Sequence, residues 1–208
     1  MNIRAFSFLL LFGAHALEVA SQSPAVAFQL LSETPAVFPA TPQTVVADAL
    51  GRPYFYLAAK AAGLQVFDIQ NPAQPKWVKS VSMALLGGLE VSNACQRGAY
   101  LYLALGNFFN PSGQKPGLAI VDVSNPLSPV VKDVWIASTP DEGGAFVAVS
   151  GDYAYLGAMK QGLFILNIAN PGDIKWVSQT IPDPDFPIPN PSSIQHPNAR
   201  GLAVNGDL

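Results

Sequence analysis

The sequence predicts an all-β protein of short strands and tight turns, and three observations support this fold class. Half of the 208 residues are hydrophobic and only 12% are charged, so the chain can build a core and is not of the disordered class. Nineteen prolines and seventeen glycines cluster between apolar runs, as expected for strands separated by turns. One segment also recurs three times along the chain, and internal repetition indicates how the strands are organised.

The recurring segment begins with glycine, continues as a short apolar strand that contains Asp or Asn, and ends in an Asn-Pro turn. Its copies are residues 63–72, 117–126 and 162–171. A polar residue at the same place in every copy is expected to accept hydrogen bonds from backbone amides of the adjoining turn. We therefore predict structural rather than functional roles for the repeated positions Asp68, Asp122 and Asn167 in the strands and Asn71, Asn125 and Asn170 in the turns.

Three further strands are expected around each copy. An apolar strand comes first, at residues 44–47, 88–91 and 145–149. A tyrosine-containing strand follows it, at residues 54–57, 100–103 and 153–156, and a last strand lies after the Asn-Pro turn, at residues 76–81, 130–135 and 175–179. Four short strands joined by such turns form a β-propeller blade, and a blade must stack on neighbours to bury both apolar faces. We predict blades at about 44–82, 88–137 and 144–180, with the start of a fourth at 200–208.

The repeated pattern Gly-Leu-x-Ile/Val-Val/Phe-Asp-Ile/Val-x-Asn-Pro resembles the LVIVD repeat, which is named for residues of its third strand. Residues 118–123 match it most closely, whereas Asn167 stands where the pattern has Asp. The resemblance covers about residues 40–208. It implies a β-propeller of exported, often bacterial-surface proteins, and it implies no general activity.

The N-terminus has the features of a signal peptide. Arg4 precedes an apolar run at residues 5–13, and residues 14–16 match the small-x-small rule for cleavage. A membrane anchor is the alternative, but the run is shorter than the ~20 apolar residues that a span needs, and Glu18 ends it. We expect residues 1–16 to be removed, no membrane span to remain, and a bacterial protein exported to the periplasm, cell surface or medium.

Just over three blades cannot close a ring, because propellers typically have about four to eight. Residues 17–43 form an N-terminal segment in which a strand at about 25–34 is expected to complete the last blade of a closed ring. Our hypothesis is that the ring is incomplete in this chain, which is the N-terminal part of a longer protein. Self-association that completes the ring is the alternative.

No catalytic constellation is visible in the sequence. His196 is the single histidine after the expected leader, and the lone Cys95 is expected to be buried and inert. The net charge of −3 provides no basic surface, which argues against nucleic acid as a partner. Asp183 and Asp185 are weak candidates for calcium, and no other cofactor is predicted. Trp77 and Trp176 are expected to pack between blades or to cover an outer edge.

Two insertions, residues 105–116 and 181–198, interrupt the regular spacing. Loops on a rigid scaffold often carry function, so the binding-loop candidates are Phe108, Phe109, Phe186 and His196. The leading hypothesis is a non-enzymatic scaffold that binds an unknown protein or glycan at one rim of the propeller. The alternative is a lactonase-like hydrolase with a metal in the central channel, for which Glu90 and Asn93 are the available candidates. A spacer without a ligand is the third possibility.

Overall fold

A computed structural model of the chain describes residues 29–33, 43–107, 114–139, 142–186 and 196–205. The chain divides into two units, residues 1–30 and 31–208. Of the first unit the structure describes Gln29 and Leu30, which are exposed and lie outside regular secondary structure. All strands of the described residues belong to the second unit. Within the described ranges, no helix is long and apolar enough to cross a membrane.

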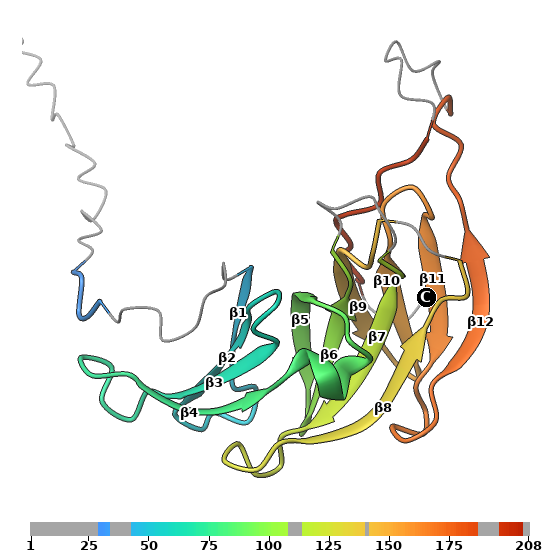
Figure 1. Ribbon diagram of the computed structural model, residues 1–208. Coiled ribbons are helices and arrows are strands. Elements are labelled where there is room, and N and C mark those ends of the chain that lie inside the picture. Colours follow the sequence, from blue (N-terminus) through green and yellow to red (C-terminus); the bar gives the residue numbers. More distant parts are fainter. Residues whose placement is uncertain (1–28, 34–42, 108–113, 140–141, 187–195, 206–208) are drawn as a thin grey trace, which may run out of the picture. The chain divides into compact units, whose positions relative to one another are not determined.

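The described residues of the second unit form three antiparallel four-stranded sheets, each with its strands side by side in chain order (Figure 1). The first sheet contains β1 (Thr44–Ala47), β2 (Tyr54–Ala58), β3 (Leu64–Asp68) and β4 (Lys76–Val81). The second contains β5 (Val91–Arg97), β6 (Tyr100–Leu105), β7 (Gly117–Asp122) and β8 (Val130–Ile136). The third contains β9 (Phe146–Ser150), β10 (Tyr153–Gly157), β11 (Leu163–Asn167) and β12 (Lys175–Thr180). This succession of blades confirms the predicted fold class, and among the described residues the three blades do not close a ring.

The first strand of the second blade differs from the prediction. Residues 88–91 were expected to form it, but β5 begins at Val91 and continues to Arg97. A 3₁₀ helix, η1 (Met83–Leu86), precedes it, and Gly87 and Gly88 then adopt φ values of 68° and 76°. These left-handed conformations suit glycine and end the helix in a turn. Of the four residues predicted for the strand, Gly88 belongs to this turn, Leu89 and Glu90 lie outside regular secondary structure, and Val91 begins β5.

The two ends of the repeat region also differ in part from expectation. Residues 29–33 belong to no strand, and the remaining residues of the expected strand at 25–34 lie outside the described part of the chain. Near the C-terminus, Ala199 forms a backbone bridge with Met159, as Val91 does with Lys60 in the first blade. Ala199 therefore occupies the place at which the next blade would begin. Residues 200–205 form no strand, and residues 206–208 lie outside the description.

The second blade packs on both of its neighbours because its strands alternate between two apolar faces. In β6, Leu101 and Leu103 belong to a buried cluster shared with the first blade, which includes Tyr56. Tyr102 and Ala104 belong to a second buried cluster, shared with the third blade. Successive strand residues point to opposite faces, so a strand covered on both sides is apolar at nearly every position. This arrangement explains the continuous hydrophobic runs of the repeat.

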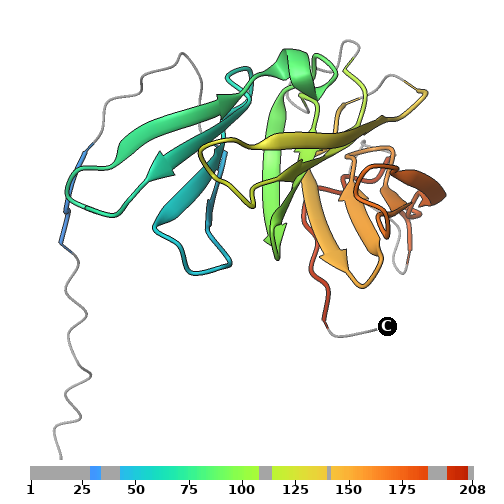
Figure 2. The ribbon, with the colours of Figure 1, turned by 90° about the horizontal axis from the view of Figure 1, so that it is seen from below.

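Figure 2 shows the three blades in succession. One asparagine connects the first strands of all three. The Asn93 Nδ2 donates a hydrogen bond to the Thr44 Oγ1 in β1 at 2.9 Å, and the Asn93 Oδ1 accepts one from the Val147 N–H in β9 at 3.2 Å. Strand β5 contacts both β1 and β9. Asn93 is buried, and buried amides require such partners. Its side chain therefore helps to hold the blades in register with one another.

A buried carboxylate, that of Asp48 directly after β1, connects the first two blades. Asp48 accepts hydrogen bonds from Arg52 at 2.6 and 3.2 Å and from the Tyr56 hydroxyl at 2.6 Å. Arg52 also donates to the carbonyl oxygens of Val123 and Ser124 in the second blade at 2.9 and 2.7 Å. Burial opposes ionisation of Asp48, but the hydrogen bonds from Arg52, Tyr56 and the Leu50 N–H outweigh it and lower its pKa to about 2.

Acid should weaken this connection in a defined pH range. Because the pKa of Asp48 is lower in the folded chain than its ordinary value of 3.8, its contribution is complete above pH 4 and is lost as the pH falls towards 2. We expect Asp48→Asn to lower the free energy of unfolding at pH 7 by roughly 2 kcal/mol and to flatten its decrease between pH 4 and 2. Urea unfolding at several pH values measures both effects.

Asp68→Asn is the matched control for this experiment. Asn167 occupies the equivalent position of the third blade and accepts the equivalent turn hydrogen bond, so this substitution should leave stability nearly unchanged. Equal losses for the two variants would show that the Asp48 cluster has no special role in joining the blades.

Candidate functional site

The two ends of the blades have different loops. At one end the second strand turns into the third and the fourth strand leads to the next blade. We call this end the insertion rim; its described residues are 59–63, 82–90, 106–107, 114–116, 137–139, 142–145, 158–162 and 181–186. The opposite end, the turn rim, comprises residues 48–53, 69–75, 98–99, 123–129, 151–152 and 168–174. The first insertion noted in the sequence connects β6 to β7 at the insertion rim, and the second begins at the same rim after β12.

The repeated polar residues organise the turn rim. Each of the six accepts a hydrogen bond from the backbone N–H two residues further along the chain, at 2.7–3.1 Å; they are Asp68, Asn71, Asp122, Asn125, Asn167 and Asn170. The side chain and the backbone N–H of Ser124 both donate to Asp122 and lower the pKa of its carboxyl. Because the same bonds occur in every blade, these residues stabilise the turns of the repeat.

Two of the four binding-loop candidates from the sequence, Phe186 and His196, lie within the described residues. Phe108 and Phe109 lie outside the described residues. Phe186 is 80% exposed, and the exposed His196 has its Nδ1 3.0 Å from the Pro197 carbonyl oxygen.

The calcium candidates form a local turn. The Asp183 Oδ1 accepts the Asp185 N–H at 2.9 Å, and both side chains are exposed. In the part of the chain that the structure describes, no group of three or more His, Cys, Asp or Glu residues is placed to hold a metal ion.

The polar residues considered for a central channel have structural contacts. The Glu90 Oε1 accepts a hydrogen bond from the Asn107 Nδ2 at 3.1 Å, and Asn93 joins β1 and β9 as described above. Cys95 lies within β5, where burial raises the pKa of its thiol to about 11. The thiol is therefore neutral at physiological pH and a poor nucleophile.

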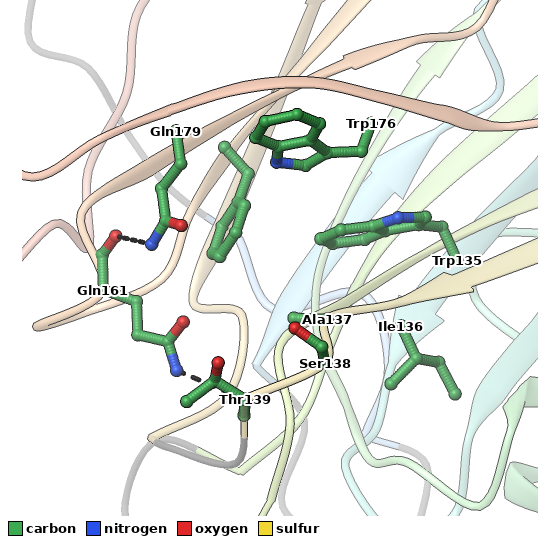
Figure 3. Close-up of a pocket in the computed structure, with 9 residues that line it drawn as sticks. Trp135, Ile136, Ala137, Ser138, Thr139, Gln161, Trp176 and Gln179 are labelled. Atoms are coloured by element: carbon green, nitrogen blue, oxygen red, sulfur yellow. Dashed lines mark hydrogen bonds between the residues drawn. The ribbon is translucent and has the colours of Figure 1, made fainter.

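A pocket that the sequence did not indicate lies at the insertion rim between the second and third blades (Figure 3). Its cavity volume is about 370 Å³. The second blade contributes residues 135–139, from the end of β8 and the segment after it, and the third blade contributes Gln161, Phe164, Trp176 and Gln179. None of these lining residues is charged.

Strand register places the aromatic residues of this pocket. Phe164 pairs with Gln179, and Leu166 pairs with Trp176 across an irregularity between β11 and β12, so all four lie on the face that the third blade turns towards the second. The Trp135 and Phe164 rings meet with their centroids 5.3 Å apart and their planes tilted by 60°. Phe164 is buried, whereas Trp176 is 57% exposed. The pocket thus has an aromatic floor and an indole at its mouth.

Hydrogen bonds fix the two glutamine side chains of the pocket. The Gln161 Nε2 donates to the Thr139 carbonyl oxygen at 3.3 Å, and the Gln179 Nε2 donates to the Gln161 carbonyl oxygen at 2.9 Å. Each amide retains one N–H and its Oε1 without a hydrogen-bond partner among the described residues. The indole N–H groups of Trp135 and Trp176 likewise donate to none of those residues. The pocket therefore presents oriented donors and acceptors beside aromatic surfaces.

The equivalent junction between the first two blades has different chemistry. When the blades are aligned by strand register, the residues equivalent to those of the pocket are all aliphatic. In the order Trp135, Phe164, Trp176 and Gln179, their equivalents are Val81, Ala119, Val131 and Val134. Helix η1 follows β4 there, Leu86 is completely buried, and Gly87 lies against the Ile136 side chain. The repeat therefore does not require aromatic and amide residues at this position. The sequence signal for the pocket was therefore the difference between equivalent strand residues of the repeat copies, and not the position of the insertions.

Trp77 has the register position of Trp176 in the first blade, opposite Phe67. Its Nε1 donates to the Gln65 Oε1 at 2.8 Å, and the side chain is 49% exposed. Both tryptophans are therefore only partly covered by their blades, and Trp77 does not line the pocket.

Comparison with known proteins identifies the repeat. The family described as LVIVD repeat matches residues 52–83, 97–135 and 145–178. No curated protein matches the chain. Among the solved structures that match is an exo-1,5-alpha-L-arabinanase from a bovine ruminal metagenomic library, with 15% sequence identity and a TM-score of 0.40. The match covers 66% of this chain and 56% of that protein, so this chain corresponds to little more than half of the arabinanase.

The exposed indole of Trp176 should matter little for folding. We expect Phe164→Ala to lower the free energy of unfolding by about 3 kcal/mol or more because it empties a buried site, whereas Trp176→Ala should lower it by about 1 kcal/mol. Chemical denaturation of the two variants tests the difference, with Trp77→Ala as the matched control for a half-exposed tryptophan. A loss with Trp176→Ala as large as that with Phe164→Ala would show that Trp176 is a packing residue.

Proposed function

The chain belongs to the LVIVD repeat family, and on that basis we propose that it is an exported binding module whose ligand occupies the pocket between the second and third blades. The observation that carries this proposal is the residue set of that pocket. Half-exposed Trp176 occurs at one junction together with Gln161 and Gln179, whose amides each use only one N–H within the described residues. The neighbouring junction has aliphatic residues at the positions of Trp176 and Gln179. A pocket with aromatic walls and a few oriented polar groups is typical of ligand sites.

Regular strands supply much of the pocket wall, which favours binding. Asn93 joins the first strands of three blades, and the pocket walls are residues of strands or directly adjoining them. A ligand that enters a preformed pocket causes little loss of protein conformational entropy. The insertion rim also carries both long loops, which could add contacts to a larger partner.

The chemistry of the described lining residues supports binding rather than catalysis. They include no carboxylate, imidazole or thiol, the side chains that most often transfer protons or attack a substrate. Amide and indole groups can hold and orient a ligand by hydrogen bonds and stacking, but they supply no acid or base at physiological pH.

The export component of the proposal predicts a shortened mature product. When the full chain is produced in a bacterial host with its own N-terminus, the secreted or periplasmic protein should begin at Leu17. Ala16→Arg should block this cleavage because signal peptidases require small residues at the site. Cell fractionation with N-terminal sequencing measures both outcomes. A cytoplasmic product that retains residues 1–16 would contradict export.

The binding component predicts ligand contact that depends on one tryptophan. Saturation-transfer NMR of the mature chain with a mixture of neutral oligosaccharides and short proline-rich peptides should detect at least one bound compound. The signal should be lost with Trp176→Ala and retained with Trp77→Ala. The bound compound should also be recovered intact by mass spectrometry. Absence of any bound compound would contradict a binding role, and a shortened compound would instead favour a hydrolase.

A further inference from the structure

We propose that the pocket between the second and third blades binds one ring of a neutral sugar chain. This inference rests on the proposed binding function and specifies the chemical class of the ligand. The ring would stack on the exposed indole of Trp176, while its hydroxyl groups would bind the amides of Gln161 and Gln179.

The absence of charge among the described lining residues favours a neutral ligand. Phosphates and carboxylates are usually bound by Arg or Lys, and cationic groups by carboxylates or aromatic cages with acidic neighbours. The pocket walls from residues 135–139 and from the third blade offer none of these charged groups. A neutral ligand needs no counter-charge, and it must satisfy the polar groups of the pocket by hydrogen bonds alone.

The arrangement of the side chains suits a ligand with one apolar face and polar edges. Figure 3 shows the indoles of Trp135 and Trp176 on one side of the pocket and the side chains of Gln161 and Gln179 on the other. A sugar ring has a face of C–H groups, which packs against the π face of an indole, and hydroxyl groups around its edge. The two sides of the pocket correspond to these two parts of a sugar ring.

The hydrogen-bonding groups distinguish a sugar from a proline-rich peptide, which could also stack on tryptophan. Gln161 and Gln179 each offer an Oε1 acceptor as well as an N–H donor, because only one N–H of each amide is used within the described residues. A polyproline segment has carbonyl acceptors but no backbone N–H, so it could not satisfy either Oε1. A hydroxyl group both donates and accepts, and can satisfy both parts of an amide.

The size and openness of the pocket favour one ring of a longer chain. Its volume of about 370 Å³ lies near the lower end of the ~300–1,000 Å³ of ligand pockets. Trp176 is 57% exposed at the mouth, so a ring stacked there could have linked sugars that continue into solvent or over the insertion rim. An isolated sugar would leave much of this indole uncovered.

Isothermal titration calorimetry of the mature chain tests this inference. The probes are maltohexaose, cellohexaose, xylohexaose and mannohexaose as neutral sugars, oligogalacturonate as a charged sugar, and decaproline as a peptide. We expect at least one neutral hexasaccharide to bind and oligogalacturonate and decaproline not to bind. Trp176→Ala should weaken the affinity by about tenfold or more, and Gln179→Ala by severalfold. Trp77→Ala, the register-matched control, should leave the affinity unchanged.

Each other result has a defined meaning. If no neutral hexasaccharide binds at millimolar concentration, the sugar inference is overturned. If decaproline alone binds and Trp176→Ala abolishes its binding, the sugar inference fails while the proposed binding function stands. If no probe binds, both fail. Trp176→Phe, which retains an aromatic face, should keep most of the affinity, and thermal unfolding of every variant separates loss of binding from loss of fold.

Discussion

The structure depends on one constraint, which is that a four-stranded blade has two apolar faces and needs a neighbour on each. The second blade shows the consequence most clearly, because Leu101 and Leu103 pack towards the first blade and Tyr102 and Ala104 towards the third. Polar groups reinforce the same junctions. Asn93 joins β1, β5 and β9, and Arg52 links Asp48 to carbonyl oxygens of the second blade. Most of the buried hydrophobic residues belong to the two clusters that neighbouring blades share, so contacts between blades contribute much of the stability of the fold.

Because the junctions carry the core, they are also where a repeat can acquire a site without disturbing its strands. The first junction is aliphatic at the relevant positions and has η1 beside it, with Leu86 completely buried. The second has Trp135 and Phe164 at equivalent positions, and a pocket remains beside their rings. The strand register is similar at both junctions, so the difference arises from side chains and from the segment that follows the fourth strand. This is how repeated scaffolds commonly separate function from fold.

The repeat motif was sufficient to predict the blades, since glycine, an apolar strand and an Asn-Pro turn recur in register. It also predicted that Asp68 and its equivalents would accept turn amides, and these hydrogen bonds are present. The start of β5 was predicted wrongly because apolar residues near Gly88 suggested a strand, whereas two consecutive left-handed glycines form a turn. The pocket was missed for a different reason. Its side chains lie mostly within regular strands, and only packing between blades brings Gln161 and Trp135 together.

The contrast between Trp77 and Trp176 bears on the ligand site proposed at the second junction. Both occupy the same register position and both are about half exposed. Trp77 donates its indole N–H to Gln65, whose position is taken by Phe164 in the third blade. That replacement removes the partner of the indole and adds an aromatic floor to the pocket. An exposed indole with an unused donor contributes less to folding than one that is fully packed and hydrogen-bonded. Its full interaction energy is available only when a ligand covers the ring and accepts a hydrogen bond from the indole N–H, and a sugar hydroxyl beside a C–H face would offer both contacts.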